Sequence, residues 1–235
     1  MSYVRFRTNA ACLLAGFTVL WILPDGASAK SNDRKETNTL GKAAGVLQGM
    51  LAKDDVPPAL LAKAKCIVVL PDVKKFGIGI GGTGGRGAMS CRTGKGFNGP
   101  WSAPAIYSVS GASVGLQLGG SSTDYALLVM TDNGVDALLK GKTKLGSSAS
   151  IAAGPSGSTA VSSAGGTDIL SYGRTTGLFA GVSLGGAALD PDDSANRDLY
   201  GKAITAREIL IANSVATPPA AHALVSLLNS KAKAH

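Results

Sequence analysis

A glycine-dense stretch between residues 66 and 104 constrains this chain more than any other feature. It opens with an apolar, β-branched run over residues 67–70, which ends at Pro71 and is typical of a buried strand. Between residues 76 and 81, glycines then occupy one side of a period-2 alternation and large apolar residues the other. Glycine inside a strand marks a bend or the close approach of another backbone or a ligand. We therefore expect a sharply bent, closely packed pair of strands.

Within this stretch, Gly77, Gly79 and Gly82 match the G-x-G-x-x-G pattern of dinucleotide-binding loops. Such a loop must lead from a strand directly into a helix whose N-terminus holds the pyrophosphate. Residues 83–99 contain six glycines and no apolar residues at helical spacing, so they cannot supply that helix. The pattern favours a bent strand pair over a nucleotide site, and we predict no cofactor.

The composition indicates one domain with much β structure. The chain has 235 residues, 32 of them glycine, and only 5% aromatic residues. A core of Ala, Val, Ile and Leu around glycine-lined approaches fits these values. We expect an α+β fold whose strongly bent, mainly antiparallel, glycine-rich sheet is barrel- or sandwich-like and is flanked by N- and C-terminal helices.

The N-terminus is typical of an export signal. Arg5 and Arg7 precede an apolar run over residues 10–23, and small residues follow up to Ala29. Because that run is short for a membrane span, we predict a signal peptide over residues 1–29 that is cleaved before Lys30. The mature protein is then expected in the periplasm or at the cell envelope, with a flexible leader over residues 30–38 and a single domain over residues 39–235.

Two cysteines remain after export. Cys12 belongs to the predicted signal peptide, whereas Cys66 and Cys91 lie on strand-like segments expected to be neighbours. Because the compartment oxidises thiols, we predict a disulfide between them, with two buried thiols as the alternative. Two cysteines without a nearby histidine make a poor metal site, and we predict no metal.

The charge of the chain favours anionic partners. Its formal net charge is +8, which suits lipid head groups or acidic polymers. Nucleic acid is disfavoured by the exported address and by the scarcity of aromatic residues among the basic ones. The basic residues of interest surround the opening of the glycine-rich stretch, next to Phe76, and are Lys63, Lys65, Lys74, Lys75, Arg86, Arg92 and Lys95.

An amphipathic helix is predicted ahead of this stretch, from residue 39 to about residue 53. Its apolar face is expected to include Leu40, Leu47, Met50 and Leu51. That face can pack on the core of the domain or also meet a membrane, and the periodicity leaves both interpretations open. Further on, residues 105–110 and 114–118 alternate and residues 125–130 form a continuous apolar run, so we expect three successive antiparallel strands there. A last helix is expected over residues 220–231.

Several segments resemble successive blocks of the SYLF domain family, of the bacterial exported type. They include LLAKAKCIVVLPDVKKFGIGIGGTGGRGAMSCRT, WSAPAIYSVSGASVGLQLGGSSTDYALLVM and ILSYGRTTGLFAGVSLGGAALDPDDSANRDLYG, in this order. The resemblance implies a lipid-binding module, since eukaryotic relatives are associated with phosphoinositide membranes, through an amphipathic N-terminal helix and a basic surface, and some with actin. The chain departs from the family pattern at Cys66 and Cys91. An exported bacterial protein also meets neither phosphoinositides nor actin, so its ligand can differ although the fold is shared.

Two other chemistries are suggested by local patterns. Ser113 and Ser183 each lie in G-x-S-x-G, but a nucleophile elbow needs a helix after the serine, and both lie inside alternating strand patterns. The acidic residues between 190 and 198 could ligate Ca²⁺, but their spacing does not match an EF-hand loop and helix capping also accounts for them.

We predict a non-enzymatic module that binds an anionic phospholipid or another lipid at a membrane surface. The alternatives are a structural envelope protein without a small ligand and a serine hydrolase that uses Ser113 or Ser183; no protein partner is identified. The predicted lipid-binding residues are Leu40, Leu47, Met50, Leu51, Lys63, Lys65, Lys74, Lys75, Phe76 and Arg86.

Overall fold

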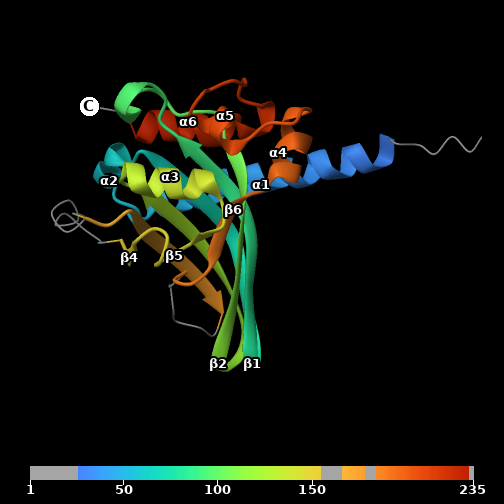
Figure 1. The fold of residues 1–235 in the computed structure, drawn as a ribbon, viewed down its shortest axis with the longest axis vertical. Helices are drawn as coiled ribbons and strands as arrows, with labels where there is room; N and C mark the ends of the chain where they lie inside the picture. The colour runs from blue at the N-terminus through green and yellow to red at the C-terminus, as the bar shows by residue number, and fades with distance from the viewer. Residues whose placement is uncertain (1–25, 155–165, 178–183, 233–235) are drawn as a thin grey trace, which may run out of the picture.

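The computed structural model describes residues 26–154, 166–177 and 184–232, and it shows the expected α+β fold (Figure 1). A strongly curled, mainly antiparallel six-stranded sheet has the order β3-β6-β2-β5-β4, and β1 pairs with the other edge of β2. The strands are β1 Cys66–Cys91, β2 Ala105–Val129, β3 Thr143–Lys144, β4 Ile151–Ala153, β5 Ile169–Gly177 and β6 Ala188–Pro191. The α-helices are α1 Gly26–Ala52, α2 Pro58–Lys63, α3 Asp132–Lys140, α4 Asp193–Tyr200, α5 Ala206–Leu210 and α6 His222–Lys231.

The long β1–β2 ribbon dominates the molecule. Its antiparallel register runs from Cys66 opposite Val129 to Met89 opposite Ala105, and it projects as a stem from the layer of helices (Figure 1). The prediction of three separate strands between residues 105 and 130 was wrong, because β2 is one continuous strand. The register shifts at residues 70–73 and 78–80 of β1 let the ribbon bend without interruption.

The ribbon folds back on itself, and the two ends of β1 meet. The N–H of Arg92, just past one end, donates a hydrogen bond of 2.8 Å to the carbonyl of Lys65, just before the other. Gly87 lies where the two halves cross, and a Cβ atom there would be 2.0 Å from the carbonyl oxygen of Val69. Glycine is therefore required at this crossing, which lies outside the 76–81 alternation from which the sequence predicted a close approach.

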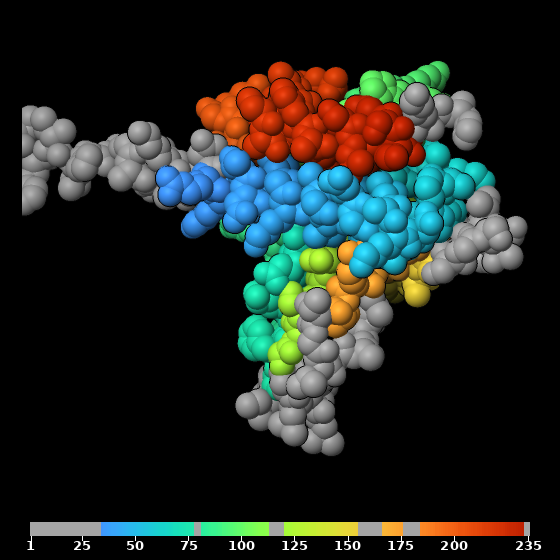
Figure 2. All heavy atoms as spheres, turned by 180° about the vertical axis from the view of Figure 1, so that it is seen from behind, coloured from blue at the N-terminus to red at the C-terminus, as the bar shows by residue number. Residues whose placement is uncertain are grey.

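The two faces of the ribbon bury separate cores. The outer face, which carries Ile67 and Leu128, packs against α1 and α6. The inner face, which carries Val68 and Leu127, encloses a second apolar cluster together with α3 and α5. Figure 2 shows α1 lying between the C-terminal helices and the stem of the ribbon. The base of the ribbon is thus covered on both sides.

Helix α1 is longer than the sequence predicted. It begins at Gly26, so residues 30–38 are helical and the prediction of a flexible leader there was wrong. Glu36 gives a reason, because this carboxylate is buried and lies 3.6 Å from the guanidinium of Arg86, which in turn is 2.9 Å from Asp192. The ion-pair cluster ties the first half of α1 to β1 and to the start of α4.

No helix in the described part of the chain is long and apolar enough to cross a membrane.

Capping residues mark the ends of three helices. Thr131 caps α3, which Gly141 follows, and Thr205 forms a capping box with Glu208 at the start of α5. In the acidic cluster, Asp192 caps α4 by accepting a hydrogen bond from the N–H of Ala195. Helix capping thus accounts for this carboxylate.

Some predicted features fall outside the described residues. They are most of the signal peptide, at residues 1–25, and Ser183. The signal peptide and the exported location remain predictions.

Candidate functional site

The predicted disulfide is present. Cys66 and Cys91 are joined by an S–S bond of 2.02 Å, with their Cα atoms 3.9 Å apart. Both residues are fully buried. They lie at the two ends of one strand rather than on two neighbouring strands, so the bond fastens the folded-back ribbon at its base.

The predicted membrane face of α1 lies inside the protein. Leu40 and Leu47 are completely inaccessible, Met50 is 1% exposed, and Leu51 is half-buried against the same cluster. In this fold these side chains are covered by the ribbon and the C-terminal helices, so they do not form an accessible surface, and lipid binding by them stays a prediction. Of the two interpretations of the amphipathic pattern, packing on the core is confirmed.

The predicted basic residues do not form one surface. Lys65 makes a 2.7 Å ion pair with Asp132, and Arg86 binds Glu36 and Asp192. Lys63 is exposed at the end of α2. Two of these three cations are thus occupied by carboxylates.

One group of predicted residues is positioned to meet a partner. Phe76 is 65% exposed and, among the residues whose side chains the structure describes, which leave out 78–80 and 113–119 of the ribbon, it is the one exposed large apolar side chain. The side chain of Lys74 is 67% exposed and lies 3.3 Å from Asp72. Lys75 lies on the inner face instead, with its ammonium 5.9 Å from the centre of the Tyr125 ring, and burial lowers the pKa of Lys75. Lys74 and Phe76 therefore combine charge and apolar surface on the outer face of the stem.

The register extends this face across the sheet. Lys74 pairs with Ser122, which alternates along β2 with Asp124, and Asp124 pairs with Arg174 of β5. Alternate residues of a strand share a face. Arg174 and Phe76 therefore lie on the same outer face, roughly 15 Å apart by ordinary strand spacing and rise.

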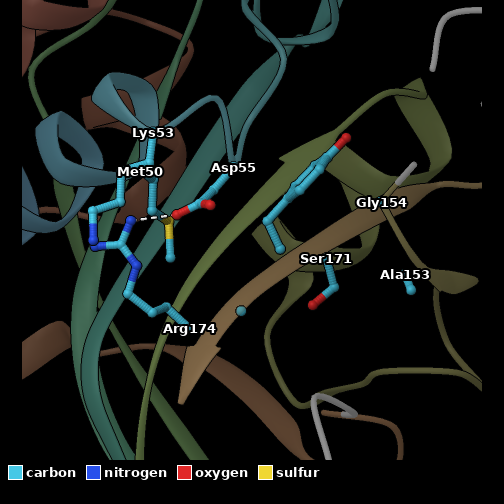
Figure 3. Close-up of a pocket in the computed structure, with 9 residues that line it drawn as sticks. Met50, Lys53, Asp55, Ala153, Gly154, Ser171 and Arg174 are labelled. Carbon is cyan, nitrogen blue, oxygen red and sulfur yellow. Dashed lines mark hydrogen bonds and ion pairs between the residues drawn. The ribbon is translucent and has the colours of Figure 1, made fainter. Parts of the chain in front are cut away.

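A pocket of about 460 Å³ opens at Arg174 near the end of α1 (Figure 3), beyond the last residue pair that β4 makes with β5. Its lining comes from three segments that are distant in sequence. The lining residues are Met50, Lys53, Asp55, Ala153, Gly154, Ser171, Tyr172, Gly173 and Arg174.

Arg174 holds the wall of this pocket together. Its Nη2 donates a hydrogen bond of 3.1 Å to the carbonyl of Gly49 near the end of α1 and pairs with the carboxylate of Asp55 (Figure 3). One guanidinium thus connects the edge of the sheet to the helix and to the turn that follows it. Lys53 and Asp55 come from that turn, so two cations and one anion line the cavity.

The opposite wall is formed by a close contact between a glycine and a ring. A Cβ atom at Gly154 would be 2.1 Å from Cζ of Tyr172, so only glycine fits there. Burial raises the pKa of Tyr172 to about 12, which keeps its hydroxyl neutral. The hydroxyl of Ser171, also in the lining, is buried and has no hydrogen-bond partner among the described residues.

Comparison with known proteins places the chain in a family. The family model described as "Ysc84: Las17-binding protein actin regulator" matches residues 110–231. The chain belongs to this family. The SYLF resemblance seen in the sequence is thereby confirmed.

Curated relatives of this SYLF protein include an SH3 domain-containing protein of Schizosaccharomyces pombe, 36% identical over 88% of the chain and 49% of the relative. Protein YSC84 of Saccharomyces cerevisiae is 33% identical over 89% of the chain and 45% of its own length. The mouse SH3 domain-containing YSC84-like protein 1 is 31% identical over 74% of the chain and 51% of its own length. The chain spans about half the length of the curated relatives it matches. No solved structure matched.

Ser113 does not have the backbone geometry that a serine hydrolase requires around its nucleophile. This residue pairs with Gly81 in the middle of β2, which continues as a strand to Val129. A nucleophile elbow requires a turn into a helix directly after the serine. His222 lies at the start of α6, where its Nε2 is 3.2 Å from the carbonyl of Thr217.

The sequence did not indicate the pocket. In the sequence, Lys53 and Asp55 are typical of the polar end of a helix. Arg174 is typical of an alternating position in a strand. Their proximity depends on the pairing of β5 with β2 and on the docking of α1 on the sheet, which no local pattern encodes. The glycine at position 154 was a weak signal, because it stands where a strand ends.

Proposed function

We propose that this SYLF protein is a non-enzymatic lipid-binding module of the cell envelope and that it meets the membrane with the outer face of its ribbon. The observation that carries the proposal is the exposed Phe76 beside Lys74 on the projecting stem. An apolar side chain can enter the interfacial region while a cation holds anionic head groups, and the two contributions together give firmer attachment than either alone.

The location in the envelope is part of the proposal. It is supported by the export signal predicted over residues 1–29 and by the disulfide, which is typical of oxidising compartments. The membership in a family of proteins named for binding and regulation supports a binding role over catalysis.

Binding of a protein is the second candidate function. It is favoured by the names of two relatives in Saccharomyces cerevisiae, called LAS seventeen-binding protein 3, and by the description of the family. The same exposed face would serve a protein partner, and the test below separates the two.

Vesicle co-sedimentation tests the membrane proposal. Phe76→Ser should weaken binding to phosphatidylglycerol-containing vesicles about tenfold at every salt concentration, because an apolar contact is lost. Lys74→Glu should weaken binding at low salt by a similar factor and reduce its salt dependence, since lysines near an anionic surface contribute about 1 kcal/mol each and charge reversal doubles the change. Lys63→Glu, which changes the same charge on an exposed site away from the stem, is the matched control and should have a smaller effect.

Circular dichroism must show each variant folded. If folded Phe76→Ser and Lys74→Glu proteins sediment as the wild type does, attachment through the ribbon is wrong. If the wild type does not sediment at all, the protein-binding alternative becomes the better account.

A further inference from the structure

We propose that the pocket at Arg174 binds a phosphoethanolamine head group, the phosphate lying on the two cations and the ammonium on Asp55. The inference rests on the proposed lipid-binding function and names the chemical class of the lipid. Nothing in the membrane-contact proposal requires it, because Phe76 and Lys74 can attach to a bilayer whether or not the pocket is filled.

The charges of the lining carry the assignment. Lys53 and Arg174 supply two positive charges, and Asp55 supplies one negative charge. A simple anion such as a phosphatidylglycerol head group would use the cations but would be repelled by the carboxylate. A phosphodiester with a primary ammonium presents one charge of each sign, so it gains from all three side chains.

The hydrogen-bonding groups also fit. The Nη2 of Arg174 binds the carbonyl of Gly49 and the carboxylate of Asp55, while its Nη1 and Nε donate to no acceptor among the described residues. The Asp55 side chain is 41% exposed and that of Arg174 is 32% exposed, so both remain accessible from the cavity.

The size of the cavity suits a lipid better than a free phosphate. At about 460 Å³ it falls within the ordinary range for small-molecule sites and exceeds what one phosphate fills. Because the pocket opens on the face that carries Phe76, a lipid held here stays next to the surface proposed to meet the membrane.

Isothermal titration with soluble lipids tests the inference. The mature protein is titrated with dihexanoyl-phosphatidylethanolamine, -phosphatidylglycerol and -phosphatidylcholine below their micelle concentrations, and with O-phosphoethanolamine. We expect the ethanolamine lipid to bind about tenfold more tightly than the glycerol lipid. The choline lipid should also bind more weakly, because its quaternary ammonium donates no hydrogen bond to Asp55.

Variants assign the roles of the charges. Asp55→Asn should abolish the preference for ethanolamine over glycerol, whereas Lys53→Gln should weaken the binding of both lipids by a similar factor. Lys63→Gln, an exposed lysine outside the pocket, is the control and should leave both affinities unchanged. Arg174 is not substituted because it also joins α1 to the sheet.

Each outcome decides the question. Equal affinity for the ethanolamine and glycerol lipids, or an unchanged preference in folded Asp55→Asn, would overturn the inference. O-phosphoethanolamine that binds as tightly as the dihexanoyl lipid would show that the pocket recognises a soluble phosphoamine and not a lipid. If the protein still sediments with vesicles while the soluble lipids fail to bind, the pocket assignment is wrong and the membrane proposal stands. If the protein binds the soluble lipids but does not sediment with vesicles, only the membrane proposal is refuted.

Discussion

The crossing of the folded-back ribbon at Gly87 can be tested with a single methyl group. In Gly87→Ala the new Cβ would be 2.0 Å from the carbonyl oxygen of Val69 and 2.8 Å from Cα of Leu70. Ordinary contacts between such atoms are about 3.5 Å, so the two halves of β1 must separate by roughly 1.5 Å. Both obstacles are backbone atoms, which cannot rotate away as a side chain can.

Overpacking a core by one methyl group typically costs 1–3 kcal/mol, and an immovable obstacle belongs at or above the upper end. We therefore expect Gly87→Ala to lower the free energy of unfolding by about 3 kcal/mol or more, or the melting temperature by roughly 6–12 °C for a domain of this size. Gly41→Ala is the matched control, because a Cβ there meets nothing within 4 Å on the exposed side of α1. It should raise stability by about 0.5–1 kcal/mol through helix propensity.

Urea and thermal unfolding of the oxidised protein measure both changes. The opposite signs of two identical substitutions distinguish a steric crossing from a general effect of adding a methyl group. If Gly87→Ala unfolds within about 1 kcal/mol of the wild type, the two halves of β1 do not cross as closely as described, and the steric account is refuted.

Three further predictions concern the disulfide and two carboxylates. Replacing both Cys66 and Cys91 with Ala should cost about 3 kcal/mol, from the entropy of a closed loop with a sequence separation of 25, and thiol labelling of the native oxidised protein should modify neither cysteine; labelling of both would contradict the bond. Burial, only partly offset by Arg86, raises the pKa of Glu36, so its ionised form costs stability above that pKa and the cost vanishes as the pH falls. Glu36→Gln should therefore raise the melting temperature at pH 7, with a gain that shrinks toward the pKa of an unfolded glutamate, about 4.3; a loss at pH 7 would show that the ion pair outweighs burial. Although burial opposes ionisation of Asp168, hydrogen bonds from nearby hydroxyl, amide and backbone groups lower its pKa to about 2. Its stabilising contribution is present above about pH 3.9 and is lost as the pH falls through about 2, so Asp168→Asn should lower the melting temperature at pH 7 and make little difference at pH 2; an equal loss at both pH values would point to packing instead.

Local physics made several elements predictable from the sequence. Capping side chains such as Thr131 and the Thr205–Glu208 pair act on backbone groups within a few residues, so their spacing is sufficient to place helix ends. The glycines that occupy one side of the alternation between residues 76 and 81 predicted a bend and a close approach of another backbone. A residue without a Cβ atom leaves room for both. The pairing of Cys66 with Cys91 was predicted from their number and from the predicted export, but the folding back of β1 that brings them together was not.

Only the tertiary structure decided what covers each face and which distant segments meet. The periodicity of α1 correctly identified an apolar face, but a hydrophobic stripe is the same whether it meets a core or a membrane, and Leu47 is in the core. Turn-like residues in β2 predicted breaks where a continuous strand bends, since pairing along β1 supplies hydrogen bonds that local propensity does not count. The pocket joins Asp55 to Arg174, which is 119 residues away, because β5 pairs with β2 and α1 docks on their outer face. Long-range strand register and helix docking are set by the sum of many contacts, so a site built from them is visible only in the folded molecule.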